Sequence, residues 1–301
     1  MQLYTSCIIL TTCAGGVHVM FRTCCSTDVC TSICTVRCLL CLCCETVCAS
    51  RTGLSCLRRS FMSVRAVIFD FDLTLADSSA AIIECTDYAL HRLGTAGATP
   101  ARIGAVIGLP LHEMFRSLTG EPDPARADAF ARHFVARADE IMVHGTRIYP
   151  EVPPLLARLR EQGLAVAIVS SKFRYRIDAI LALNGLQSLV DVLIGGEDVQ
   201  RHKPDPEGLE LALARLGLPA AAAIYVGDHA VDAQAAERAG VPFVGAVSGM
   251  TSFDAWARAG KQAVTAHIGE LAAIVRRMQR ASGEARVDAE RGAEPADRTA
   301  D

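Results

Sequence analysis

The stretch from Val67 to Ser78 reads VIFDFDLTLADS, and the rest of the chain is organised around it. An apolar run ends at Asp70, which predicts a buried parallel strand over residues 64–69. Side chains two positions apart in an extended chain share a face, so Asp70 and Asp72 can converge on one point. Sites in open α/β sheets lie beyond the carboxyl ends of the strands. A solvated Asp-x-Asp at a strand end would read the same way, so the downstream motifs decide between the two interpretations.

Length, charge and cysteine usage limit the class of protein. A chain of 301 residues holds one large domain or two smaller ones, and its net charge of −3 indicates neither a nucleic acid nor a membrane as a partner. Twelve of the 13 cysteines fall between Cys7 and Cys56, and only Cys85 follows them. A long body with one cysteine is typical of a reducing compartment, so we expect a cytoplasmic enzyme in which Cys85 is a small buried hydrophobic residue.

Residues 1–61 are predicted to be a cysteine-rich appendage with little persistent structure. They show no sustained helical or alternating period, and the apolar run from Cys7 to Phe21 is interrupted by Gly15 and Gly16. That run lacks a basic leader and is too short to span a membrane. Its paired cysteines lack the well-spaced second pair that a zinc site needs. Met62 stands directly before the first predicted strand.

Residues 78–146 are predicted to form a helical cap inserted into the core. Apolar residues recur there at the helical period, with Thr99-Pro100, Leu109-Pro110 and Asp123-Pro124 as helix starts. This gives four helices: one from Ser78 to Gly94, a short one ending at Ile107, and two more. Asp77 is interpreted as the residue that caps the first helix. A lid over the site is the functional interpretation of this insertion.

After residue 150 the sequence alternates between strands and helices. Strands are predicted at 164–169, 190–194, 223–226 and 242–247, with an edge strand at 263–267, and helices at 151–162, 175–183, 206–216 and 231–239. This alternation predicts an α/β fold with a doubly wound parallel sheet, whose core domain comprises residues 62–77 and 147–280. Residues 281–301 are rich in Ala, Glu, Asp, Arg and Gly and are expected to be a disordered tail.

Polar residues follow four of the predicted strands. They are Asp70 and Asp72 after the first, Ser170 after the second, Lys203 after the third, and Asp228 and Asp232 after the fourth. Carboxylates that meet in one crevice cannot all ionise without a cation, and donors that are all oxygen favour Mg²⁺. A lysine and a hydroxyl beside that ion suit the oxygens of a phosphoryl group. The pattern therefore indicates phosphoryl chemistry on a small phosphorylated metabolite.

Over residues 64–275 the chain resembles the haloacid dehalogenase-like superfamily, and within it the phosphoglycolate phosphatase-like phosphatases. The resemblance rests on four motifs in order: Asp-x-Asp-x-Thr at 70–74, a strand ending at Ser170, Lys203, and Gly-Asp-x-x-x-Asp at 227–232. It implies a Rossmann-like core with a helical cap of the C1 type. Gly195-Gly196-Glu197-Asp198-Val199 also matches this subfamily.

The resemblance implies a role for each motif residue. Asp70 attacks phosphorus, and Asp72 protonates the leaving oxygen and later activates water. Mg²⁺ is held by Asp70, the backbone carbonyl of Asp72, and Asp228. The remaining roles are phosphate binding by Ser170, Ser171 and Lys203, and support of the ligands and of Lys203 by Thr74 and Asp232.

Departures from the family pattern leave the substrate open. Ser171 stands where asparagine is common, His229 where serine is usual, and Leu73 where glycine is frequent. We expect a phosphomonoester, with 2-phosphoglycolate as the leading substrate. The alternatives are an inorganic pyrophosphatase, a β-phosphoglucomutase-like mutase, and a non-catalytic binding module. The sequence is compatible with a monomer or a homodimer.

Basic residues near the motifs have two interpretations. Lys172, Arg174 and Arg176 follow the second strand and either contact a carboxylate of the substrate or form a solvated helix start, which we favour. Six basic residues of the cap could set specificity, and for each of them a surface role is favoured. They are His112, Arg116, His133, Arg137, His144 and Arg147.

Overall fold

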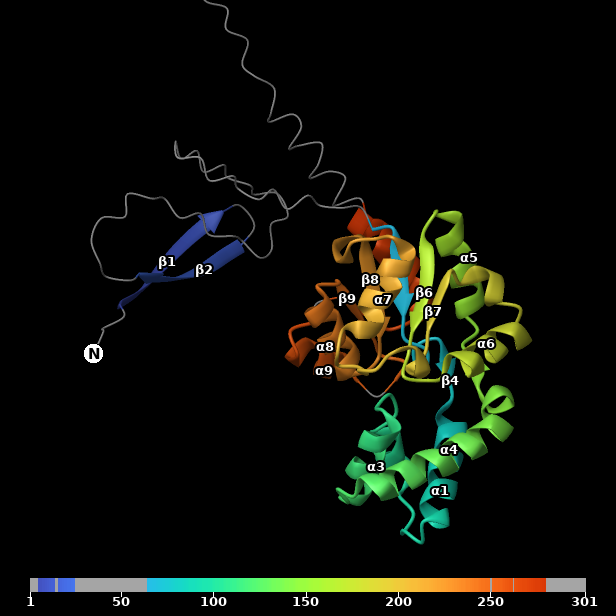
Figure 1. Cartoon of the computed structure of the whole chain (residues 1–301). Coiled ribbons are helices and arrows are strands. Elements are labelled where there is room, and N and C mark those ends of the chain that lie inside the picture. The colour runs from blue at the N-terminus through green and yellow to red at the C-terminus, as the bar shows by residue number, and fades with distance from the viewer. Residues whose placement is uncertain (1–4, 14–15, 25–63, 250, 262, 280–301) are drawn as a thin grey trace, which may run out of the picture. The chain divides into compact units, whose positions relative to one another are not determined.

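The computed structural model describes residues 5–13, 16–24, 64–249, 251–261 and 263–279 (Figure 1). The chain divides into two compact units, Met1–Ser55 and Cys56–Asp301, which are described separately. Within the described ranges, no helix has the length and apolarity that a membrane span requires.

A six-stranded parallel sheet forms the core of the larger unit, in the order β10-β9-β8-β3-β6-β7. Its strands are β3 (Ala66–Phe69), β6 (Ala165–Val169), β7 (Val192–Ile194), β8 (Ala223–Gly227), β9 (Phe243–Ala246) and β10 (Val264–Thr265). The first strand of the unit, β3, therefore lies in the middle of the sheet, between β6 and β8. The predicted α/β fold with a doubly wound parallel sheet is confirmed.

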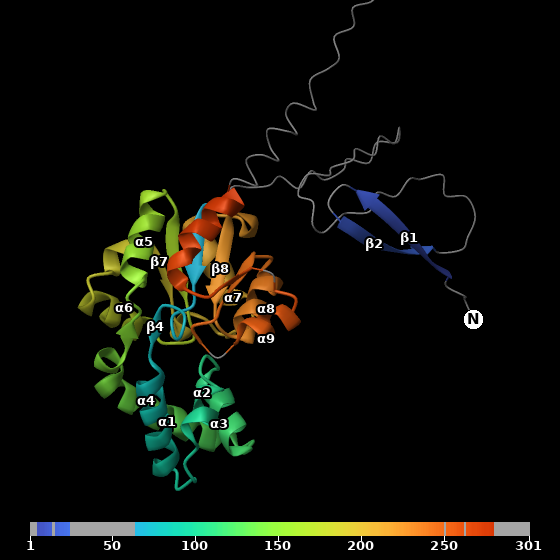
Figure 2. The same ribbon diagram turned by 180° about the vertical axis from the view of Figure 1, so that it is seen from behind.

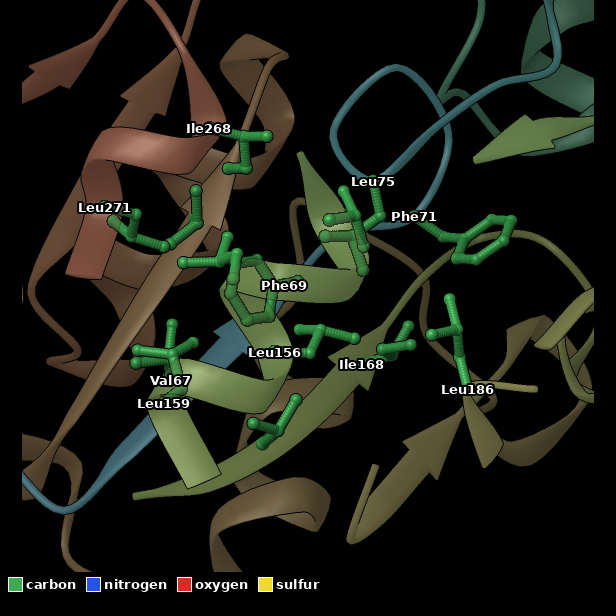
Figure 3. Close-up of a cluster of buried hydrophobic side chains, with 14 of the residues drawn as sticks. Val67, Phe69, Phe71, Leu75, Leu156, Leu159, Ile168, Leu186, Ile268 and Leu271 are labelled. Carbon is green, nitrogen blue, oxygen red and sulfur yellow. The ribbon is translucent and has the colours of Figure 1, made fainter. Parts of the chain in front are cut away.

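Helices cover both faces of this sheet (Figures 1 and 2). Side chains of β3 alternate between the faces, because successive residues of a strand point in opposite directions. Val67 and Phe69 belong to a hydrophobic cluster with residues of α5 (Val152–Glu161) and α6 (Arg174–Leu183), as the close-up in Figure 3 shows for Leu156 and Leu159. On the other face, a second cluster joins β3 to α7 (Glu207–Leu216) and α8 (Ala230–Ala239).

The remaining helices of the core are short. They are α9 (Phe253–Arg258) and the 3₁₀ helices η1 (Gln187–Leu189), η2 (Gly196–Asp198), η3 (Ala220–Ala222) and η4 (Ile268–Glu270). A further helical segment covers residues 271–279. Its Leu271 and Val275 are buried in the same cluster as Val67. The predicted core strands and helices are found at their expected places, with ends that shift by one or two residues.

The inserted cap consists of four helices, as predicted. They are α1 (Ser79–Arg92), α2 (Pro100–Gly104), α3 (Leu111–Thr119) and α4 (Pro124–Gly145). Their apolar faces share a hydrophobic cluster that includes Cys85, Phe115 and Phe130, and Cys85 is fully buried as expected. Two short antiparallel strands, β4 (Ala76–Asp77) and β5 (Arg147–Ile148), connect the cap to the core.

Two details of the cap differ from the predictions. Helix α2 ends at Gly104 and not at Ile107, because the chain turns there before the loop that leads to α3. The N-cap position of α1 is Ser78, whose side chain makes no capping hydrogen bond. Asp77 lies in β4, and its Oδ1 accepts a hydrogen bond from the backbone N–H of Ser79 at 2.9 Å. Asp77 therefore satisfies a helix donor, but from one residue before the cap.

The smaller unit contains an antiparallel hairpin of β1 (Thr5–Cys13) and β2 (Gly16–Cys24). This differs from the expectation of little structure in residues 1–61. The first strand contains three Thr and two Ile, and the second two Val, one Phe and one Thr, residue types that favour strands even without a strict apolar alternation. The cysteine pairs after residue 24 and the tail at 281–301 lie outside the described residues.

Candidate active site

The carboxyl ends of three adjacent strands place the motif residues at one edge of the sheet. In the parallel register, Phe69 of β3 pairs with Ile168 of β6 and with Val226 of β8. Asp70, Ser170 and Asp228 stand one or two positions beyond these partners. The backbone N–H of Asp70 extends the ladder by donating to the carbonyl oxygen of Val226 at 2.8 Å. The predicted convergence of distant sequence motifs therefore follows from the strand register.

Lys203 lies between two buried carboxylates. Its Nζ donates to Asp70 Oδ1 at 2.8 Å and to Asp232 Oδ1 at 2.6 Å, and all three side chains are buried. Burial lowers the pKa of Lys203, but the charges of Asp232 and Asp70 outweigh it, so its pKa lies well above the ordinary lysine value. The ammonium is therefore a permanent positive charge that fixes one oxygen of Asp70.

Tyr225 contacts two of the motif residues, and the sequence analysis did not identify it. Its hydroxyl accepts from Lys203 Nζ at 3.2 Å and donates to Asp232 Oδ1 at 2.9 Å. It lies in β8, within a run of apolar residues, where a tyrosine reads as an ordinary core residue. The signal that could have found it is its position: it precedes Asp228 by three residues on the strand that delivers that carboxylate.

The absence of a side chain at Gly227 allows the side chain of Asp232, in α8, to pack against the end of β8. A Cβ atom added to Gly227 would lie 2.6 Å from the Cβ of Asp232, closer than such atoms approach one another. Oδ2 of Asp232 accepts from the backbone N–H of His229 at 3.0 Å, and the Nδ1 of His229 accepts from the N–H of Val231 at 3.2 Å. The histidine that replaces the usual serine therefore caps α8, and the start of this helix holds Asp232 in place.

Three carboxylates form a group that could hold a cation. One oxygen each of Asp70, Asp228 and Asp232 lies within 4.8 Å of the others. Thr74 Oγ1 donates to Asp228 Oδ1 at 3.1 Å. Burial raises the pKa of Asp70 to about 6 although Lys203 opposes it, and burial together with Asp232 and Asp70 raises the pKa of Asp228 well above its usual range. Negative charge here exceeds what Lys203 neutralises.

This excess charge fits a divalent cation. A bound divalent cation would neutralise this charge and favour the ionised form of both Asp70 and Asp228, and the donors are all oxygen, as hard cations such as Mg²⁺ prefer. Of the predicted metal carboxylates, Asp70 and Asp228 belong to the group. Asp232, predicted to support Lys203, both contacts Lys203 and lies in the group.

The carboxylate of Asp72 lies outside this group and points to other partners. Its Oδ1 is 2.9 Å from the Nζ of Lys172 and accepts from Ser78 Oγ at 2.5 Å, and its side chain is 12% exposed. Ser78 in turn accepts from Thr146 Oγ1 at 3.2 Å. Ser78 and Thr146 border the two strands that join the cap to the core. The predicted proton donor is therefore connected to both hinge segments.

The two serines after β6 face different partners. Ser170 is buried, and its Oγ accepts from the backbone N–H of Lys172 at 3.4 Å. Ser171 Oγ donates to the carbonyl oxygen of Gly108 in the cap at 3.1 Å. Ser170 therefore lies at the end of β6, at the same edge of the sheet as the carboxylates, whereas the hydroxyl of Ser171 contacts the cap.

The interpretation of a solvated helix start is wrong for two of the three basic residues after β6. Both Lys172 and Arg176 are buried. Lys172 pairs with Asp72, and the cap supplies Asp139 as the partner of Arg176. Arg174 is exposed and pairs with Asp198, as a surface residue would. The six basic residues of the cap are all exposed or half-buried, in agreement with the surface roles favoured for them.

Comparison with known proteins identifies the family. The model of the haloacid dehalogenase-like hydrolases matches residues 67–246. Phosphoglycolate phosphatase from Yersinia pestis is 33% identical over 218 residues, which cover 70% of this chain and 93% of the relative. The phosphoglycolate phosphatase of Rhodobacter capsulatus is 37% identical over 183 residues, covering 60% and 82% of the two chains. The chain belongs to the haloacid dehalogenase-like hydrolases.

Solved structures agree with this assignment. A haloacid dehalogenase-like hydrolase from Bacteroides fragilis has a TM-score of 0.67 and 39% identity, over 69% of this chain and all of the other. A predicted phosphoglycolate phosphatase from Haemophilus somnus has a TM-score of 0.64 at 23% identity, over 70% and 97%, and supports the fold alone. Within its family, the chain is a phosphatase of the phosphoglycolate phosphatase-like kind, with a helical cap of the C1 type.

Proposed function

We propose that the protein is a Mg²⁺-dependent phosphatase that hydrolyses a small phosphomonoester through an aspartyl-phosphate, with 2-phosphoglycolate as the leading substrate. The observation that carries this proposal is the arrangement of Asp70: a buried carboxylate at the end of the central strand, 2.8 Å from Lys203 and grouped with Asp228 and Asp232. The names of the relatives from Yersinia pestis and Rhodobacter capsulatus support the choice of substrate.

Asp70 is the proposed nucleophile. Lys203 binds its Oδ1, which leaves the second oxygen to bond to phosphorus while the bond from phosphorus to the ester oxygen breaks. The hydroxyl of Ser170 and the ammonium of Lys203 are proposed to bind the phosphoryl oxygens, where negative charge is concentrated during transfer.

Asp72 is the proposed acid and base. It gives its proton to the departing ester oxygen and then removes one from the water that cleaves the aspartyl-phosphate, and a general acid of this kind contributes about 10²–10⁴-fold. The hydroxyl of Ser78, at 2.5 Å, and the Nζ of Lys172, at 2.9 Å, bind Oδ1 of Asp72 and keep this carboxyl outside the group of three carboxylates. Two carboxyls with different surroundings can thus take the opposite roles of nucleophile and acid.

Asp70 and Asp228, with the backbone carbonyl of Asp72 as predicted, are the residues that would hold Mg²⁺. When bound, the ion supplies positive charge to the phosphoryl oxygens and to the buried carboxylates. Thr74 fixes Asp228 through its hydrogen bond, and Asp232 holds Lys203 beside Asp70. Closing the cap over this edge would exclude water until the leaving group departs.

The test is a phosphate-release assay on 2-phosphoglycolate, pyrophosphate and hexose phosphates, with and without a chelator. We expect release that requires Mg²⁺ and that falls at least about 10³-fold in Asp70→Asn, because the nucleophile is lost. Asp254→Asn, an exposed aspartate on α9, is the matched control and should keep full activity. Activity that survives chelation or Asp70→Asn would overturn the mechanism.

The same assay separates the alternatives. Pyrophosphate as the best substrate would assign a pyrophosphatase. Interconversion of glucose phosphates without net phosphate release would assign a mutase. A folded protein with no turnover on the whole panel would assign a non-catalytic binding module.

A further inference from the structure

We propose that Lys172 selects substrates whose leaving group carries a negative charge next to the ester oxygen, as a carboxylate or a second phosphate does. This inference rests on the proposed phosphatase function and adds to it the chemical class of the leaving group. It also gives a second role to a buried cation that the proposed mechanism uses only to hold Asp72.

The position of Lys172 brings it to the leaving-group side of the site. It follows Ser170 by two residues after β6, and its backbone N–H donates to the Ser170 hydroxyl at 3.4 Å. Its Nζ lies 2.9 Å from Oδ1 of Asp72, the proposed proton donor to the ester oxygen. A charged group one or two bonds beyond that oxygen would therefore come within reach of the same ammonium.

The ammonium of Lys172 retains capacity for another anion. Its side chain is only 4% exposed, and an ammonium has three N–H donors. Among the described residues, its one ion pair is with Asp72, whose same oxygen also accepts from Ser78. Ser78 would hold Asp72 without the lysine, so Lys172 is not required for that task alone.

The other buried cations in the described part of the chain already have partners away from the proposed proton donor Asp72. They are Lys203, which contacts Asp70 and Asp232, and Arg176, which contacts Asp139 and the carbonyl oxygen of Val135. A carboxylate buried under a closed cap is costly unless a cation pairs with it. Lys172 is the buried cation that can supply this pairing, whereas the hydroxyl groups of a sugar would leave Asp72 as the only anion beside the ammonium.

The experiment compares substrates that differ in one charge. Phosphate release by the full chain is measured for 2-phosphoglycolate, for its uncharged amide 2-phosphoglycolamide, and for pyrophosphate. The variant Lys172→Met removes the charge and keeps the length of the side chain, and Lys172→Arg keeps the charge. Arg174→Met removes a positive charge from the same segment at an exposed position, and it is the matched control.

We expect the wild type to prefer 2-phosphoglycolate over the amide by at least about tenfold in kcat/KM, the scale of a hydrogen-bonded charge. Lys172→Met should lose at least about tenfold more kcat/KM on the charged substrates than on the amide, so that the preference disappears. Lys172→Arg should retain part of the preference, and Arg174→Met all of it. The better of the two charged substrates identifies whether the anion is a carboxylate or a phosphate.

Three results would overturn the inference. Equal losses on acid and amide in Lys172→Met would make Lys172 a positioning residue for Asp72. A wild type that hydrolyses both substrates equally would exclude a charge-selecting site while the phosphatase function stands, and this result needs no variant to fold. Absence of phosphate release from every substrate would overturn the inference together with the proposed function.

Discussion

At the scale of single residues, Leu73 combines a backbone conformation that suits glycine with a side chain that packs in the cap. Its φ of 59° lies in the left-handed region, which costs a residue with a side chain about 1–2 kcal/mol. The side chain is 7% exposed and belongs to the same cluster as Ile82 and Phe115. Burying a leucine contributes about 1.5–3 kcal/mol, so packing outweighs the strain.

This conflict predicts an unusual order of stability for variants at position 73. Leu73→Ala loses the buried side chain and keeps the strain, whereas Leu73→Gly loses both. Both variants should unfold at lower urea concentration than the wild type, and the glycine variant should be more stable than the alanine variant by about 1 kcal/mol. Ala179→Gly, at an exposed position of α6, should show the opposite preference, a loss of about 1 kcal/mol. An alanine variant as stable as the glycine variant would contradict the left-handed conformation.

At the scale of secondary-structure elements, core helix α6 is joined to cap helix α4 by the contacts of a single arginine, Arg176. Arg176 donates Nε and Nη2 to Asp139 Oδ1 at 2.9 and 2.6 Å, and Nη2 also donates to the carbonyl oxygen of Val135 at 3.0 Å. The hydroxyl of Tyr175 donates to the same carboxylate at 2.5 Å. The rings of Phe173 and Tyr175 lie 5.2 and 5.0 Å from the guanidinium carbon. None of these residues belongs to the hinge strands β4 and β5, so this contact attaches the cap to the core in addition to the hinge.

A double-mutant cycle should detect this attachment. In the cycle of Arg176→Met and Asp139→Asn, urea unfolding should give a coupling free energy of about 1 kcal/mol, since Arg176 is buried but Asp139 is 47% exposed and partly screened by solvent. The surface pair of Lys261 and Glu237, 3.5 Å apart, serves as the control cycle and should show coupling near zero. A coupling no larger than that of the control would mean that the Arg176–Asp139 contact does not help to hold the cap.

At the scale of the whole molecule, features set by residues close together in the sequence or by the geometry of a parallel sheet could be predicted, whereas other contacts between distant segments could not. The strands, the four cap helices and the convergence of Asp70 with Lys203 and Asp228 follow from periodicity and from the geometry of parallel sheets. The burial of Lys172 could not be predicted, because its partner Asp72 lies about 100 residues earlier in the sequence and meets it only in the folded chain. The role of Tyr225 could not be predicted either, because its hydroxyl contacts Lys203 only in the folded chain.

The larger unit should fold and act without the residues before it. The six-stranded sheet, its two hydrophobic clusters and the cap all lie within residues 64–279, and the segment Met1–Ser55 forms a separate unit. We therefore predict that a fragment from Met62 to Asp301 has the urea midpoint of the full chain and the same specific activity. An insoluble or inactive fragment would show that the preceding residues are needed.

This fragment also contains an internal reporter of correct folding, since Cys85 is its only cysteine. The thiol is fully buried in the cap, and burial, reinforced by the charge of Glu84, raises the pKa of Cys85 to about 11. Because the thiolate is the reactive form, iodoacetamide should label the native fragment very slowly at pH 8, and the labelling rate should rise toward pH 11 and not level off near pH 9. In denaturing urea the same thiol should react at the rate of a free cysteine. Rapid labelling of the native fragment at pH 8 would mean that the cap does not close over Cys85 when the N-terminal residues are removed.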